Sequence, residues 1–211
     1  MASETGTNPG SDMGWIHIFE RGHGPTTLLL LHGTGANEHQ LLGLGRQVAP
    51  EAHLLSVRGR SLEEGFPRFF RRFTATEYDQ EHLISEALAL ADFVGRAAEQ
   101  YQLDPAKVYA LGYSNGANIA LASLSLRPGP YAGAVLLRPV LALAAPPETD
   151  LRGKNVLVLN GRRDPFLPMA TAIVPYLSER GAETAERTMD AGHELSSQDV
   201  TVVRDWLRAV S

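Results

Sequence analysis

Short apolar runs alternate with longer amphipathic runs along this chain. Residues 26–31 are Thr-Thr-Leu-Leu-Leu-Leu, an apolar run of strand length that predicts a strand covered on both faces. Residues 81–100 instead place Ile84, Leu88 and Ala91 on one helical face with charged residues opposite, which predicts an amphipathic surface helix. The same criteria predict strands over 15–19, 53–57, 108–111, 133–137, 155–160 and 183–188, and helices over 38–48, 115–126, 169–180 and from about 196.

This alternation indicates an α/β protein. Strands separated by helices form a mainly parallel, doubly wound sheet with helices on both faces. Two stretches show neither the hydrophobic period of a helix nor that of a strand. Residues 58–73 combine four phenylalanines with five arginines and either cap the core or line a site, and residues 139–150 are either a ligand-binding loop or a plain connection.

The segment 111–117, Leu-Gly-Tyr-Ser-Asn-Gly-Ala, lies where a predicted strand gives way to a helix. A serine flanked by Gly112 and Gly116 at such a reversal matches the Gly-x-Ser-x-Gly nucleophile elbow, in which small neighbours allow a tight turn to lift the hydroxyl clear of the sheet. An ordinary Gly/Ser turn is the alternative. Ser114 is the candidate nucleophile.

A serine hydroxyl becomes a nucleophile only when an imidazole takes its proton and a carboxylate orients that imidazole. In elbow folds these partners follow the serine in the order acid, then histidine. Asp164 follows the second predicted strand after the elbow, and His193 is the only histidine after Ser114. The alternatives are a turn aspartate and a solvated loop histidine, with Asp190 and Glu194 as competing carboxylates.

Acyl chemistry also needs two N–H donors aimed at the developing oxyanion. One is expected from Asn115, directly after the serine at the start of a helix. The other is expected from Thr34, in the glycine-rich loop 32–35 that follows a buried strand. Both would act through the main chain.

Composition narrows the possible partners. At 211 residues the chain has room for one sizeable core and is expected to form one domain over 14–211. A net charge of −5 argues against nucleic acid, and the apolar runs are too short for stable membrane insertion. With no cysteine and no ligand spacing among the histidines, we expect no metal and no cofactor, and a cytoplasmic location. Residues 1–13 lack the pattern of a signal peptide and are expected to be a disordered tail.

Taken together, these motifs resemble the phospholipase/carboxylesterase (acyl-protein thioesterase-like) family, in its small bacterial carboxylesterase branch. The resemblance rests on the glycine-rich loop, the elbow, Asp164-Pro165 and Gly192-His193, with Val57-Arg58-Gly59 and the stretch 67–72 pointing to the bacterial branch. It implies a single-domain α/β-hydrolase fold without a large lid domain. The leading hypothesis is a serine carboxylesterase acting through an acyl-enzyme on a small-molecule ester. An acyl-thioesterase, a lysophospholipase and a non-catalytic binding protein are the alternatives, and a homodimer is possible.

Aromatic and basic residues suggest how the substrate is bound. Phe69, Phe70, Phe166 and Met169 are candidates for an apolar pocket wall, which favours short- to medium-chain or aromatic esters, although some of them could be core. Arg71, with Arg72 beside it, could bind a substrate carboxylate or phosphate or could make surface ion pairs.

Overall fold

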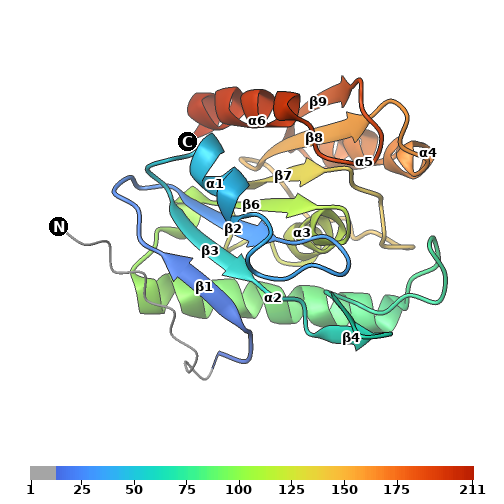
Figure 1. The fold of residues 1–211 in the computed structure, drawn as a ribbon, viewed down its shortest axis with the longest axis horizontal. Helices are drawn as coiled ribbons and strands as arrows, with labels where there is room; N and C mark the ends of the chain where they lie inside the picture. The colour runs from blue at the N-terminus through green and yellow to red at the C-terminus, as the bar shows by residue number, and fades with distance from the viewer. Residues whose placement is uncertain (1–12) are drawn as a thin grey trace.

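In a computed structural model that describes residues 13–211, the expected α/β architecture is confirmed (Figure 1). Seven strands form one sheet in the order β1-β3-β2-β6-β7-β8-β9, in which only β1 runs antiparallel to its neighbour. The strands are β1 (His17–Glu20), β2 (Thr27–Leu31), β3 (His53–Val57), β6 (Val108–Tyr113), β7 (Gly133–Leu137), β8 (Asn155–Gly161) and β9 (Glu183–Met189).

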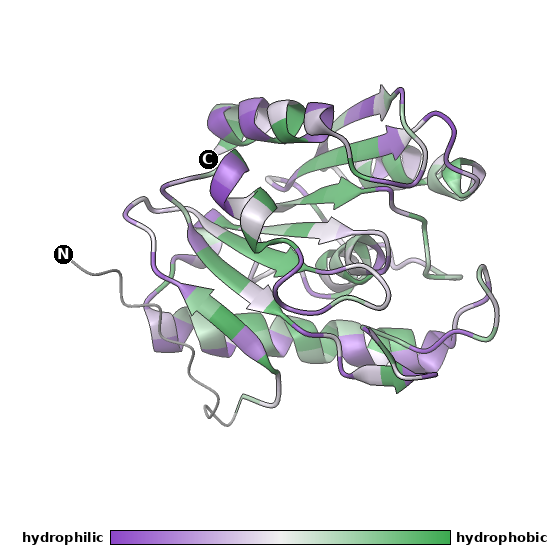
Figure 2. Ribbon diagram, viewed as in Figure 1, coloured by the Kyte–Doolittle hydropathy of each residue, from purple (hydrophilic) through white to green (hydrophobic). Residues whose placement is uncertain are grey.

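Helices cover both faces of this sheet. One face packs against α1 (Leu42–Val48) and α6 (Ser197–Val210), and the other against α2 (Gln80–Tyr101), α3 (Asn115–Leu126) and α5 (Ile173–Glu179). Every residue of β2 and β7 is therefore buried, as a continuous apolar run requires. Figure 2 shows the central strands as hydrophobic, while α2 and α6 alternate in hydropathy.

Three segments differ from the sequence-based prediction. The predicted helix 38–48 begins only at Leu42, because Glu38 is buried in an ion pair with Arg58. The connection 58–73 contains a hairpin of β4 (Ser61–Glu63) and β5 (Phe66–Arg68). The predicted helix 169–180 is interrupted between α4 (Leu167–Ala170) and α5. Pro175 explains the break, since proline has no N–H to donate to the carbonyl four residues earlier. A short 3₁₀ helix, η1 (Pro105–Lys107), precedes β6.

The segment before β1 is part of the core. Met13 and Trp15 are 6% and 5% exposed, so the prediction that Met13 belongs to the tail is wrong, and this residue is part of the folded domain. The tail expected over residues 1–12 lies outside the described residues. Within the described part of the chain, no helix has the length and apolar character needed to cross a bilayer.

Candidate active site

Ser114 lies at the carboxyl end of β6, between the strand and α3. Its φ of 53° and ψ of −116° are strained for a residue with a side chain. The turn is possible because its neighbours lack side chains: a Cβ on Gly112 would lie 2.3 Å from the Gly116 carbonyl oxygen, and one on Gly116 would lie 1.9 Å from that of Leu31. This is the geometry that the Gly-x-Ser-x-Gly pattern predicts.

The structure brings the three predicted side chains into one hydrogen-bonded chain. The Ser114 hydroxyl lies 2.8 Å from His193 Nε2, and His193 Nδ1 lies 2.8 Å from Asp164 Oδ2. With Nδ1–H donated to the carboxylate, Nε2 is left as the acceptor for the serine proton. The side chain of Asp164 is 4% exposed and that of His193 is 31% exposed, so the hydrogen-bonded side chains lead from the interior to the surface.

The Asp164 carboxylate is oriented from its own loop, which follows β8. Its Oδ1 accepts the backbone N–H of Phe166 at 2.9 Å, leaving Oδ2 for His193. The competing carboxylates are occupied elsewhere. Asp190 pairs with Arg163 on the surface, and Glu194 accepts the backbone N–H of Gly192 at 2.9 Å.

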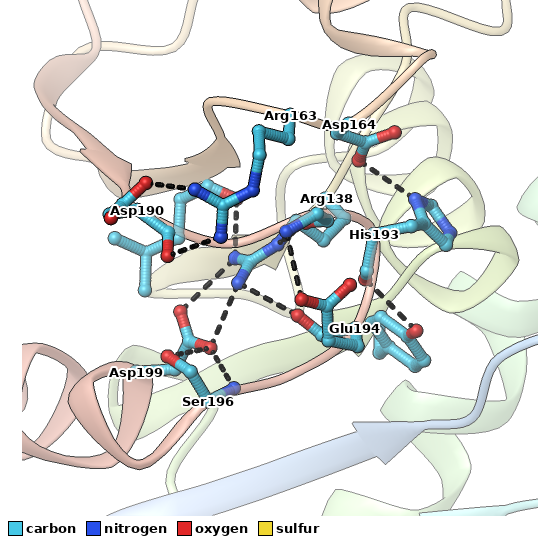
Figure 3. Close-up of polar contacts among 11 residues, drawn as sticks. Arg138, Arg163, Asp164, Asp190, His193, Glu194, Ser196 and Asp199 are labelled. Carbon is cyan, nitrogen blue, oxygen red and sulfur yellow. Dashed lines mark hydrogen bonds and ion pairs between the residues drawn. The ribbon is translucent and has the colours of Figure 1, made fainter.

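Arg138 holds the loop that carries His193 through hydrogen bonds (Figure 3). Its guanidinium donates to the carbonyl oxygens of Gly192 and Glu194, the residues on either side of His193, each at 3.1 Å. A bidentate ion pair with Asp199 at the start of α6 holds the guanidinium, and the two side chains are 0% and 1% exposed. Arg138 thus links the end of β7, the histidine loop and α6.

Thr34 and Asn115, the predicted oxyanion donors, lie beside Ser114 in the same pocket. Among the described groups, neither backbone N–H has a hydrogen-bond acceptor. The Asn115 side chain is engaged instead, because its Oδ1 accepts the backbone N–H of Phe69 at 2.8 Å.

His32 holds the glycine-rich loop in place. Its Nδ1–H donates to the Gly33 carbonyl oxygen at 2.7 Å, and its Nε2 accepts the Gly59 N–H at 2.9 Å. Burial lowers the pKa of this imidazole, which is consistent with a neutral ring serving as donor on one side and acceptor on the other.

The side chains around Ser114 enclose a pocket of about 390 Å³, including its open mouth. Phe166 forms one wall, with its ring edge-on to His193 at 5.3 Å between centroids. The lining residues are Thr34, Arg72, Ala75, Tyr78, Ser114, Asn115, Asn118, Arg138, Val140, Phe166 and His193.

The other candidate substrate-binding residues lie elsewhere. Phe69 and Phe70 are fully buried and pack in the core against His32 and Tyr78, so they do not form the pocket wall. Met169 is half-buried against the same core and does not line the pocket. Arg71 points to the surface, where it pairs with Asp79 at 2.9 Å.

Several lining residues were not identified as such from the sequence. Asn118 follows Ser114 by one helical turn, a spacing that could have indicated it. Arg138 is a charged residue directly after a buried strand, which is also a usable signal. Val140 shows that the connection 139–150 contributes to the site. Nothing in the sequence indicated Ala75 or Tyr78.

Comparisons with known proteins identify a family of hydrolases. A family model described as phospholipase/carboxylesterase matches residues 19–211. The chain is 40% identical over 194 residues to a Bacillus subtilis (strain 168) protein named "Putative hydrolase MhqD", covering 91% of this chain and 97% of that protein. The Bacillus cereus carboxylesterase structure superposes with a TM-score of 0.91 at 36% identity, over 95% of this chain and 96% of that one. A Mesorhizobium loti carboxylesterase structure gives the same TM-score and identity, over 94% and 97% of the two chains.

In the described residues, no group of three or more histidine, cysteine or acidic side chains is arranged to hold a metal ion.

Proposed function

Because this chain belongs to the phospholipase/carboxylesterase family of α/β-hydrolases, we propose that it is a serine carboxylesterase that cleaves short- to medium-chain or aromatic esters through an acyl-enzyme. The observation that carries the proposal is the hydrogen-bonded chain from Ser114 through His193 to Asp164. These three hydrogen-bonded side chains supply a nucleophile, its base and the group that orients the base.

In the first half-reaction, Ser114 Oγ attacks the ester carbonyl carbon while His193 Nε2 takes the hydroxyl proton. Asp164 stays ionised and stabilises the imidazolium. The proton then passes from His193 to the alcohol as the C–O bond breaks, leaving an acyl group on Ser114. Water then attacks the acyl carbonyl carbon while His193 Nε2 takes its proton. The acyl C–Oγ bond breaks, the proton passes from His193 to Ser114 Oγ, and the carboxylic acid is released.

The negative charge that develops on the carbonyl oxygen needs donors already aimed at it. We assign this role to the backbone N–H groups of Thr34 and Asn115, which have no other described acceptor. Asn115 is also the first residue of α3, where the helix dipole favours an anion.

The pocket supports a small substrate. Phe166 lines it beside His193 and offers an apolar face for an acyl chain or an aromatic ring.

The test is labelling and turnover in matched serine variants. A fluorophosphonate probe is expected to label the wild type and the exposed-serine control Ser178→Ala, but not Ser114→Ala. The kcat/KM for p-nitrophenyl butyrate should fall by about 10⁴-fold or more in Ser114→Ala alone, since the nucleophile is lost. Mass spectrometry after quenching should find the acyl group on the peptide containing Ser114.

Substrate series separate the ester hypothesis from its alternatives. Acetate to hexanoate esters should be cleaved faster than palmitate esters and faster than matched acyl-thioesters. Labelling that persists in Ser114→Ala would refute the nucleophile assignment, and a preference for thioesters would indicate a thioesterase.

A further inference from the structure

The pocket is lined by two arginines, and only one of them has its charge neutralised. All five N–H donors of Arg138 are occupied, by the carboxylate of Asp199 and by three backbone carbonyl oxygens. The guanidinium of Arg72, by contrast, forms no hydrogen bond or ion pair with any described residue. It is half-buried and lies at the wall of the pocket that contains Ser114.

The backbone explains why Arg72 and its neighbour have different environments. Arg72 forms an antiparallel bridge with Tyr78, and successive side chains of extended backbone point to opposite sides. Arg71 therefore pairs with Asp79 on the surface, while Arg72 faces the pocket. The charge of Arg72 opposes the rise that burial causes in the Tyr78 pKa, as expected if the two side chains lie close together.

A half-buried cation without a partner is costly, because it gives up hydration without gaining a counter-charge. The cost is recovered when a ligand supplies that charge, and a guanidinium fork matches a carboxylate in a bidentate geometry. The whole molecule carries a net charge of −5 and disfavours anions, so an anionic substrate needs a local cation of this kind.

We propose that Arg72 binds a carboxylate of the substrate, so that the preferred substrates are esters carrying a second, free carboxylate, such as monoesters of dicarboxylic acids. This inference rests on the proposed esterase function of the same pocket. Hydrolysis of such a monoester consumes one water and yields a dicarboxylic acid and an alcohol. Arg72 takes no part in bond making; it positions the second carboxylate while Ser114 attacks the ester.

The kinetic test compares substrates matched in chain length. Monomethyl glutarate and methyl pentanoate differ only in whether the acyl chain ends in a carboxylate or a methyl group, and carboxymethyl butyrate and ethyl butyrate make the same comparison on the alcohol side. Product release is followed by chromatography. For each pair we take the ratio of kcat/KM for the charged ester to that for the neutral ester. In Arg72→Gln this ratio should fall by about 10- to 100-fold for one pair, the pair whose carboxylate lies on the side of the ester that Arg72 contacts.

Arg71→Gln is the matched control, since it removes an adjacent arginine that lies outside the pocket, and its ratio should equal that of the wild type. Arg72→Lys keeps the charge but not the fork and should give an intermediate ratio. The inference is overturned if Arg72→Gln leaves both ratios within twofold of the wild type, or if Arg71→Gln lowers them equally.

A binding measurement separates this inference from the catalytic proposal. Calorimetry should show tighter binding of monomethyl glutarate to Ser114→Ala than to Ser114→Ala/Arg72→Gln, by about 10-fold or more. That difference without labelling of Ser114 would support the carboxylate site and refute the nucleophile assignment. Equal binding together with Ser114-dependent hydrolysis of neutral esters would refute the carboxylate site and leave the esterase intact.

Discussion

The His32 imidazole illustrates how burial controls the charge of a single side chain. It is 1% exposed, and protonation would place an N–H against the Gly59 N–H that Nε2 now accepts. Desolvation therefore holds its pKa below the ordinary value of 6.5. Between the folded-state pKa and the unfolded-state pKa of about 6.5, the unfolded chain binds more protons than the folded protein. The stability that comes from the neutral His32 ring is therefore fully present above about pH 6.5 and is lost as the pH falls below it.

We predict that His32→Gln weakens the pH dependence of stability on the acid side. Urea unfolding at pH 8 and pH 5.5 gives the loss of unfolding free energy for each protein. The loss should be smaller in the variant, because one titrating group has been removed while the others are shared. An equal loss in both proteins would contradict the assignment.

At the level of residues, the sequence predicted the three hydrogen-bonded side chains and Phe166, but not most of the pocket wall. Ser114, Asp164 and His193 could be found because elbow chemistry fixes their residue types and their order. Phe69 and Phe70 were misplaced because an aromatic run without periodicity gives no direction for its side chains. Arg71 and Arg72 were indistinguishable until the bridge to Tyr78 showed which of them faces inward.

Between elements, the buried pair of Arg138 and Asp199 joins β7, α6 and the histidine loop. Asp199 also accepts the Ser196 backbone N–H at 2.6 Å, so the carboxylate that neutralises Arg138 caps α6 as well. The capping-box form of residues 196–199 is recognisable in the sequence, whereas the partner Arg138, directly after β7, is not, because it lies 61 residues away.

We predict that Arg138→Met lowers the unfolding free energy by about 3–5 kcal/mol, since Asp199 is left buried without its counter-charge. Arg138→Met/Asp199→Leu should recover part of that stability. Both variants should have reduced esterase kcat, because the carbonyl oxygens of Gly192 and Glu194 lose the donors that fix His193. Urea unfolding and steady-state kinetics provide the measurements.

Ser196→Ala is the comparison for this pair: it removes the hydroxyl that donates to Asp199 at 3.1 Å, but keeps the backbone N–H on that carboxylate and leaves Arg138 paired. Full kcat in Arg138→Met/Asp199→Leu would show that the Arg138 hydrogen bonds to Gly192 and Glu194 do not position His193.

Across the whole molecule, the sheet and its helices followed from periodicity, and the deviations came from tertiary contacts. Glu38 lies outside the helix predicted to contain it, because it is paired with Arg58. The strands of the β4–β5 hairpin have only three residues each, which is too short to show alternation. The segment before β1 joined the core because Trp15 packs against Phe69 and Phe93, with Arg60 lying 4.2 Å from its ring centroid.

We predict that Trp15→Ala destabilises the fold by about 3–5 kcal/mol, which corresponds to a fall in Tm of about 6–20 °C for a domain of this size. Trp15→Phe should cost less, since it keeps an aromatic ring against Phe69 and Phe93. Thermal unfolding followed by circular dichroism measures both variants. A Tm for Trp15→Ala within 2 °C of the wild type would show that this segment does not support the core.

The pocket side of the β3–α2 connection bears on how such an enzyme could be retargeted. Arg72, Ala75 and Tyr78 all come from residues 58–79, whereas Ser114, Asp164 and His193 come from three other loops. A chimaera that exchanges only residues 72–78 for another segment of the same length would change groups that meet the incoming molecule, while the Gly59 N–H on His32 and the Phe69 N–H on Asn115 stay in place. Part of the pocket wall is thus encoded apart from the three hydrogen-bonded side chains, whereas Phe166 comes from the same loop as Asp164.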